Sequence, residues 1–274
     1  MTASAQDSLE MMLRQLKLPS FLNHYPKAAV MAEREGWSFA RYLHHLVETE
    51  LEERSVRRID RYLRQSGLPL EKTPATLDLR RLPLKVRRQF PMLCEGGFVE
   101  RAHNVLAFGK PGRGKTHLLC AIAWSLVQRG YRVLFIPGYK LVQRLLVAKR
   151  ELLLEREFRR LDKFDVICID DIGYVQQDRE EMEVLFTFLS ERYERRSVMI
   201  SSNLVFSQWD QIFKNPMTAA AAIDRLVQYS IILELTGPSV RAEEAKKLNG
   251  GEATDTLDAG ADSATHVATD GDDP

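Results

Sequence analysis

The sequence predicts an α/β fold: a mainly parallel sheet with helices on both faces, preceded by a small helical domain. From residue 104 onward, five short apolar segments alternate with segments of helix length, which is typical of parallel strands joined by crossover helices. The first 66 residues instead show the three- and four-residue spacing of amphipathic helices. The chain has 274 residues, 45% of them apolar, so it can bury a core without disulfides.

Three helices are expected in residues 1–66. The first is indicated by apolar residues at helical spacing: Leu9, Met12, Leu13 and Leu16. Pro19 restarts the chain into a second helix that ends at Gly36. A longer third helix begins after the capping residue Ser38 and runs to about Gln65.

The second half of this third helix carries a basic stripe. Val56, Ile59 and Leu63 share one face, and arginines recur at helical steps on the other: Arg54, Arg57, Arg58, Arg61 and Arg64. Residues 54–88 hold eleven Lys and Arg and three acids, a charge of +8. Such a patch favours polyanions, and we predict DNA contacts for the five arginines, although solvated helical faces show a similar pattern.

The remaining segments complete the organisation of the chain. Strands are expected at 104–108, 132–136, 164–169, 198–201 and 230–235. Residues 67–103 form a basic connector, marked by prolines: Pro69, Pro74 and Pro83. The core spans 104–248. Residues 249–274 are rich in Ala, Asp, Gly and Thr, with seven acids and no Lys or Arg, which predicts a disordered acidic tail.

Charge and hydropathy limit the classes of protein. The whole chain has a formal charge of +1 and the tail −7, so residues 1–248 carry +8. No apolar run approaches the roughly 20 residues that cross a bilayer, and the N-terminus lacks the apolar core of a signal peptide. We therefore expect a cytoplasmic protein that does not bind membranes.

The sharpest signal is a glycine-rich loop between a strand and a helix. The run Gly109-Lys-Pro-Gly-Arg-Gly-Lys115-Thr116 follows the strand at 104–108 and opens a helical segment at 117–128. Glycines let successive N–H groups face inward, and the helix N-terminus adds partial positive charge. Lys115 is expected to neutralise phosphate and Thr116 to bind Mg²⁺. We predict that ATP phosphates are held by Gly109, Pro111, Gly112, Arg113, Gly114, Lys115, Thr116 and His117.

Two carboxylates follow the apolar strand predicted at 164–169. Asp170 and Asp171 follow the run Val166-Ile-Cys-Ile, 55 residues after Lys115. Asp170 is expected to hold Mg²⁺ through water, and Asp171 to polarise the water that attacks ATP. Paired acids at a strand end can also be solvated turn formers. With the loop upstream, we favour an ATPase, which hydrolyses ATP to ADP and phosphate.

Several motifs stand in a fixed order along the chain: GKTHL ending at Leu118, IDDIGY ending at Tyr174, RYERRS ending at Ser197, SSN ending at Asn203, FSQW ending at Trp209, AIDRL ending at Leu226 and GPSVR ending at Arg241. Together they resemble the IstB-type helper ATPases of insertion-sequence transposons, in the DnaC-like group of AAA+ proteins. The resemblance covers about residues 51–241. It implies an AAA+ core with little or no C-terminal lid, because only residues 242–248 precede the tail.

The resemblance implies roles for three further polar residues. Asn203 matches the sensor that positions the attacking water, although a turn asparagine is the alternative. Arg225 matches the arginine finger, which reaches the ATP site of a neighbouring subunit and therefore requires a homo-oligomer; the alternative is a surface Asp224–Arg225 pair. Arg241 matches a second sensor at the γ phosphate, although it also fits a surface arginine.

A second basic segment points to DNA. Residues 139–163 are long enough for two helices and carry eight basic and four acidic residues, and the predicted contacts are Lys140, Arg144, Lys149 and Arg150. Such contacts track phosphates without reading bases. The resemblance implies an oligomer that clamps and deforms double-stranded DNA and recruits and stimulates its cognate transposase. A DnaC-like helicase loader and a metabolic P-loop kinase remain alternatives.

Overall fold

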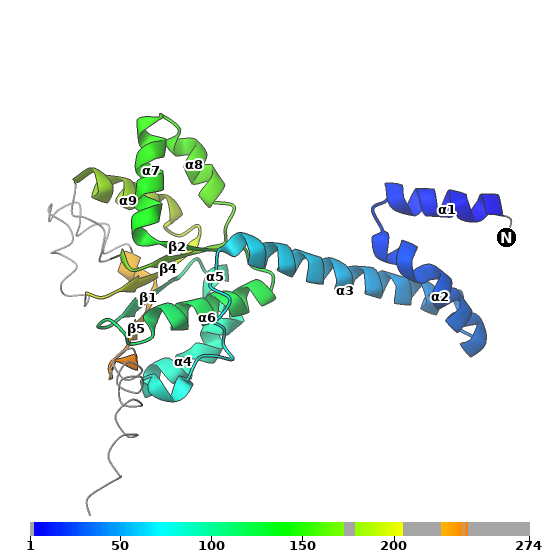
Figure 1. Ribbon diagram of the computed structural model, residues 1–274, viewed down its shortest axis with the longest axis horizontal. Helices are drawn as coiled ribbons and strands as arrows, with labels where there is room; N and C mark the ends of the chain where they lie inside the picture. The colour runs from blue at the N-terminus through cyan, green and yellow to red at the C-terminus, as the bar shows by residue number, and fades with distance from the viewer. Residues whose placement is uncertain (1–2, 173–178, 205–225, 238, 241–274) are drawn as a thin grey trace, which may run out of the picture.

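The computed structural model describes residues 3–172, 179–204, 226–237 and 239–240. Within them, five parallel strands form one sheet in the order β2-β3-β4-β1-β5 (Figure 1). The strands are β1 (Asn104–Phe108), β2 (Val133–Pro137), β3 (Val166–Asp170), β4 (Ser197–Ser202) and β5 (Ser230–Glu234). The predicted parallel sheet is confirmed, because every strand lies within two residues of its predicted bounds.

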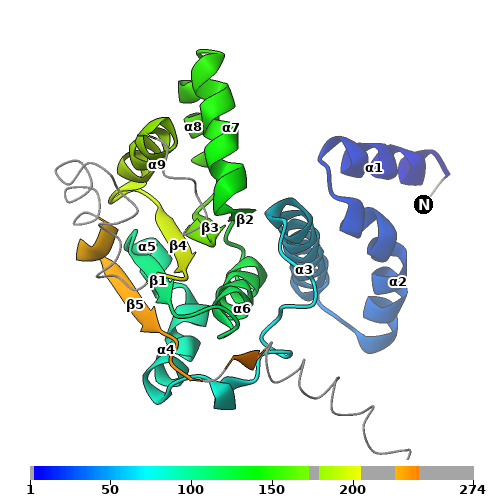
Figure 2. The ribbon, with the colours of Figure 1, turned by 60° about the vertical axis from the view of Figure 1, so that its left-hand side comes forward.

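Helices cover both faces of the sheet, as Figure 2 shows. One face is covered by α4 (Leu84–Glu95) and α6 (Lys115–Gln128), and the other by α7 (Gly138–Arg150), α8 (Leu154–Leu161) and α9 (Arg179–Arg192). Alternate residues of β1 enter the two cores: Val105 and Ala107 pack with α6, whereas Leu106 and Phe108 pack with α7 and α9. This alternation follows from the two-residue period of a strand.

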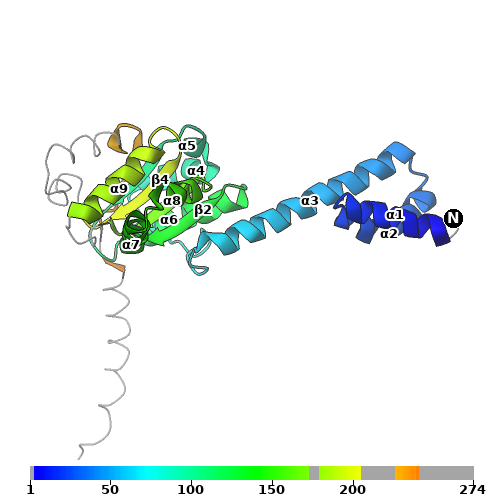
Figure 3. The ribbon, with the colours of Figure 1, turned by 90° about the horizontal axis from the view of Figure 1, so that it is seen from above.

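The N-terminal residues form three helices, α1 (Ala3–Gln15), α2 (Pro19–Glu35) and α3 (Phe39–Ser66). As predicted, Ser38 caps α3, where its Oγ accepts a hydrogen bond from Arg41 N at 3.3 Å. Gly67 ends the helix in the left-handed conformation, with φ 67°. The C-terminal end of α3 contacts β2 and α6, whereas its N-terminal half projects away from the core and carries α1 and α2 (Figures 1 and 3).

The predicted apolar face of α3 is buried over only part of its length. Ile59 and Leu63 pack against the core that surrounds α6, but Val56 is 58% exposed. The reason is geometric. Only the C-terminal end of α3 lies on the core, and Val56 lies N-terminal to this end. No helix among the described residues is both long enough and apolar enough to span a membrane.

The connector contains more regular structure than its prolines indicate. It includes a 3₁₀ turn, η1 (Leu79–Arg81), as well as α4 and the short α5 (Gly97–Glu100). Val86, Phe90 and Leu93 lie on one face of α4 and are buried against α6. Pro83 precedes the first turn of α4, where a proline is tolerated, and Pro91 lies inside the helix.

Candidate nucleotide site

The glycine-rich loop lies at the carboxyl end of β1 and leads into the N-terminus of α6. Gly112 and Gly114 have φ angles of 79° and 82°, which favour glycine. Gly109 has φ 154°, and a Cβ there would lie 2.5 Å from the carbonyl oxygen of Leu235. Arg113 Nη1 donates to this same oxygen at 3.2 Å. The loop is therefore fixed against the segment that follows β5, with its N–H groups at the start of a helix.

Lys115 reaches back across the loop from the first turn of α6. Its side chain is only 6% exposed. Its Nζ donates to the carbonyl oxygens of Gly109 at 2.6 Å and Lys110 at 3.1 Å, and to Asn203 Oδ1 at 2.6 Å. Because these acceptors are neutral oxygens, phosphate oxygens can replace them with a gain in charge pairing.

Asp170 accepts hydrogen bonds from two hydroxyl groups. Thr116 Oγ1 lies 2.8 Å from Asp170 Oδ1, and Ser201 Oγ lies 2.7 Å from the same oxygen. Thr116 and Asp170 therefore present adjacent oxygen atoms, the donor type that Mg²⁺ prefers. No group of three or more His, Cys, Asp or Glu side chains in the described residues is arranged to hold a metal. One carboxylate together with substrate phosphates is the usual Mg²⁺ arrangement, so the residues present fit this ion.

Asp171 is held by Asn203 and Ser201. Asn203 Nδ2 donates to both carboxylate oxygens of Asp171, at 2.9 and 2.8 Å, and Asn203 Oδ1 accepts from Lys115. The backbone of Asp171 is left-handed, with φ 58°, and its N–H donates to Ser201 Oγ at 2.7 Å. The amide of Asn203 thus links Lys115 to Asp171, and the hydroxyl of Ser201 links Asp170 to Asp171.

The loop and Asp171 line one cavity of about 540 Å³. The cavity is lined by the predicted residues from Pro111 to His117, together with Asp171, Asn203 and Val240. The connector supplies a further wall: Lys72, Thr76, Leu77, Asp78, Arg81 and Leu82. A cavity of this size is typical of small-ligand sites.

The connector wall was not predicted, and neither was Ser201 as a site residue. His117 Nε2 lies 3.1 Å from Thr76 Oγ1, which joins the wall to the first turn of α6. Burial lowers the pKa of His117, which favours a neutral ring. In the sequence, the positive charge of the connector was the signal that could have indicated its place at the site. Ser201 was noted only as part of the SSN motif.

The predicted DNA contacts on α3 fall into two groups. Arg54 and Arg57 form ion pairs with Glu50, at 2.6 and 3.7 Å, and Glu50 also accepts from Ser20 N at the start of α2. These two arginines therefore help to hold α2 on α3. The others are exposed and make no ion pair within the described chain: Arg58, Arg61 and Arg64.

The predicted DNA contacts on α7 are also mixed. Arg144 is bonded to Glu157 of α8, and Lys149 Nζ lies 3.3 Å from Glu183 of α9. Lys140 and Arg150 are exposed. A groove between α7 and α8 adds further cations: Arg156, Arg159, Arg160 and Lys163. Arg225 and Arg241 lie outside the described residues, as does the tail.

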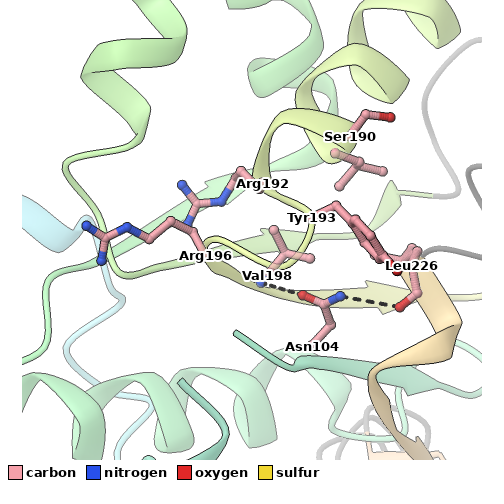
Figure 4. A pocket seen from close by; sticks show the side chains of 8 residues that line it. Asn104, Ser190, Arg192, Tyr193, Arg196, Val198 and Leu226 are labelled. Carbon is pink, nitrogen blue, oxygen red and sulfur yellow. Dashed lines mark hydrogen bonds between the residues drawn. The ribbon is translucent and has the colours of Figure 1, made fainter. Parts of the chain in front are cut away.

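A second, very small pocket lies between α9 and β4 (Figure 4). Its volume of about 10 Å³ suits no more than one water. Arg192 lines it and donates to the carbonyl oxygens of Leu161, Phe164 and Ser197. Burial lowers the pKa of this guanidinium to about 10, so it stays charged at neutral pH. Arg192 therefore has a structural role, in which it joins the segment that precedes β3 to the first residue of β4.

Comparison with known sequences identifies close relatives. A family model described as IstB-like ATP binding protein matches residues 11–248. A Sinorhizobium fredii protein named as an insertion sequence ATP-binding protein is 43% identical over 246 residues, 88% of this chain and 83% of that protein. The IS21 ATP-binding protein of Pseudomonas aeruginosa is 35% identical over 239 residues, 87% of this chain and 90% of that protein.

Comparison with solved structures identifies the fold. The crystal structure of DnaI has a TM-score of 0.53 and 21% identity, and the match covers 62% of this chain and 96% of DnaI. The replication initiator DnaA, bound to AMPPCP and single-stranded DNA, has a TM-score of 0.54 and 17% identity, and the match covers 67% of this chain and 57% of DnaA. The fold is therefore the AAA+ fold of these proteins.

Proposed function

Because the chain belongs to the family of IstB-like ATP binding proteins, we propose that it is an ATPase that serves DNA transposition. ATP binding assembles it into a homo-oligomer on double-stranded target DNA, and the oligomer recruits and stimulates the cognate transposase. The observation that carries this proposal is the convergence of Lys115, Thr116, the two aspartates and Asn203 at one end of the sheet.

The site residues divide the work of ATP hydrolysis. Lys115 and the N–H groups of the loop bind the phosphates, and the oxygens of Thr116 and Asp170 hold Mg²⁺, which screens phosphate charge when bound. Asp171 orients and polarises the attacking water, and Asn203 positions it between Asp171 and the γ phosphate. The short distances from Asn203 to both Lys115 and Asp171 support this role.

Assembly follows from a site completed by a second subunit. We assign Arg225 as the arginine finger that a neighbour inserts toward the γ phosphate, and Arg241 as a contact from the same subunit. An arginine fork stabilises charge on the transferred phosphoryl group. ATP then joins adjacent subunits, and hydrolysis releases them.

The basic surfaces supply the DNA contacts. Exposed arginines on α3 and the cations of the α7–α8 groove bind phosphates without base readout, so sequence specificity is low. The related DnaA structure holds single-stranded DNA in its own complex, which supports nucleic-acid binding by this fold. The insertion-sequence names of the relatives favour transposition over helicase loading.

The proposal is tested with a matched pair of loop variants. Lys115→Ala removes the phosphate-binding ammonium, whereas Lys110→Ala changes an exposed residue of the same loop. We expect Lys115→Ala to lower ATP turnover at least about 100-fold and to abolish ATP-dependent assembly on duplex DNA, measured by light scattering. Lys110→Ala should retain both.

Two results would contradict this function. If Lys115→Ala still assembles on DNA in response to ATP, the nucleotide site does not control assembly. If the wild-type protein binds a replicative helicase in a pull-down and fails to stimulate its transposase, helicase loading replaces transposition as the function.

A further inference from the structure

The tip of the α7–α8 hairpin exposes apolar side chains that no described element covers. Leu152 lies between the two helices and is 92% exposed, and its neighbours Leu153 and Val147 are also exposed. The tip is the end of the hairpin farthest from the sheet in Figures 1 and 2. A leucine so placed contributes almost nothing to burial, so packing within the chain does not account for it.

The backbone at this tip is held in a defined but unfavourable conformation. Leu153 N donates to Ala148 O at 2.8 Å and Leu152 N to Lys149 O at 3.1 Å, the two hydrogen bonds of a Schellman helix end. Leu152 occupies the left-handed position of that motif, with φ 57°, where glycine is usual. Both exposure and φ therefore oppose leucine here, and strain of this kind often marks a functional site.

The surroundings of the tip carry more basic than acidic side chains: residues 149–156 hold Lys149, Arg150 and Arg156 against Glu151 and Glu155. Arg150 precedes it and Arg156 follows it, and both are exposed without an ion pair in the described chain. The groove below contributes more cations: Lys140, Arg159, Arg160 and Lys163. An apolar tip within a cationic surface matches a duplex, in which stacked bases lie between rows of phosphates.

From this juxtaposition we infer that Leu152 is a wedge that enters the minor groove of duplex DNA and partly unstacks one base step. The inference rests on the proposed DNA-binding function. It explains how the protein deforms DNA, because an inserted side chain bends the duplex at the unstacked step. Flanking arginines hold the phosphates while the rigid turn presents the leucine. A leucine reads no base edges, so the wedge acts where the step is easily unstacked, such as TA or CA.

The experiment compares three substitutions at this position. Leu152→Asn and Leu152→Gly remove the apolar wedge but suit the left-handed backbone, so they fold at least as stably as the wild type. Leu152→Met keeps an apolar side chain. The readout is the fluorescence of 2-aminopurine in a duplex at saturating protein with an ATP analogue, which rises when the base unstacks. We expect a several-fold rise for the wild type and Met variant, and less than half of it for Asn and Gly.

Binding is measured in parallel, because its outcome separates this inference from the proposed function. If the wild-type protein does not bind duplex DNA, the proposed function fails and the wedge with it. If it binds with no fluorescence rise, or if Leu152→Asn matches the wild type, the wedge alone is wrong. If Leu152→Asn impairs ATP-dependent assembly without DNA, Leu152 packs on a neighbouring copy, which also overturns the wedge.

Discussion

At the residue scale, two short polar side chains connect the charged groups of the nucleotide site. The amide of Asn203 lies between Lys115 and Asp171, and the hydroxyl of Ser201 lies between Asp170 and the backbone N–H of Asp171. We expect a γ phosphate to replace Asn203 as the partner of Lys115, which lets the amide turn toward the attacking water. We expect Ser201 to keep its two contacts when ATP binds, and so to act as a positioning residue.

The role of Ser201 predicts a specific kinetic defect. In Ser201→Ala, Asp170 loses a donor and the N–H of Asp171 loses its acceptor, so both acids can shift. We expect kcat for ATP hydrolysis to fall about tenfold, which corresponds to about 1.4 kcal/mol, and the Mg²⁺ concentration for half-maximal activity to rise severalfold.

A serine of another strand in the same sheet provides the control. Ser230 of β5 also donates a hydrogen bond, to Leu226 O, but it lies at the start of its strand. Ser230→Ala should leave the Mg²⁺ dependence unchanged even if it lowers stability. Equal Mg²⁺ curves for Ser201→Ala and the wild type would show that Ser201 has only a structural role.

At the element scale, the strands and the phosphate loop could be predicted because their signals are contiguous. Each buried strand is a short apolar run, and the loop residues adjoin in sequence. By contrast, Thr76 contacts His117, 41 residues away in the sequence, and Ser201 contacts Asp170, 31 residues away. No local sequence pattern reveals such contacts. The helix α4 was missed because its prolines indicate a loop, whereas tertiary packing against α6 determines its structure.

The packing of α4 predicts a large effect on stability. Leu93 of α4 is fully buried in the core that α4 shares with α6, so Leu93→Ala leaves a cavity in that core. We expect the free energy of unfolding to fall by about 2–5 kcal/mol, measured by urea denaturation. Leu84→Ala, at an exposed position of the same helix, should change it by less than about 0.5 kcal/mol. Similar losses for both variants would mean that α4 is not packed as described.

At the scale of the whole molecule, charge is divided between a basic body and an acidic tail. Residues 1–248 carry +8 and residues 249–274 carry −7. Exposed arginines on α3 and cations of the α7–α8 groove contribute to the excess of positive charge in residues 1–248. At a distance the charges of the two parts nearly cancel, so we expect the full chain to attract DNA far less than its basic body alone would.

This division predicts how DNA affinity depends on salt when the tail is changed. Deleting residues 249–274 raises the net charge of the chain from +1 to +8, so we expect about a tenfold tighter dissociation constant for duplex DNA at 50 mM salt. The gain should shrink toward high salt, because screening removes long-range attraction. A full-length variant with all seven tail acids changed to Asn or Gln separates charge from length, and it should match the deletion. If it instead matches the wild type, the length of the tail rather than its charge limits DNA binding.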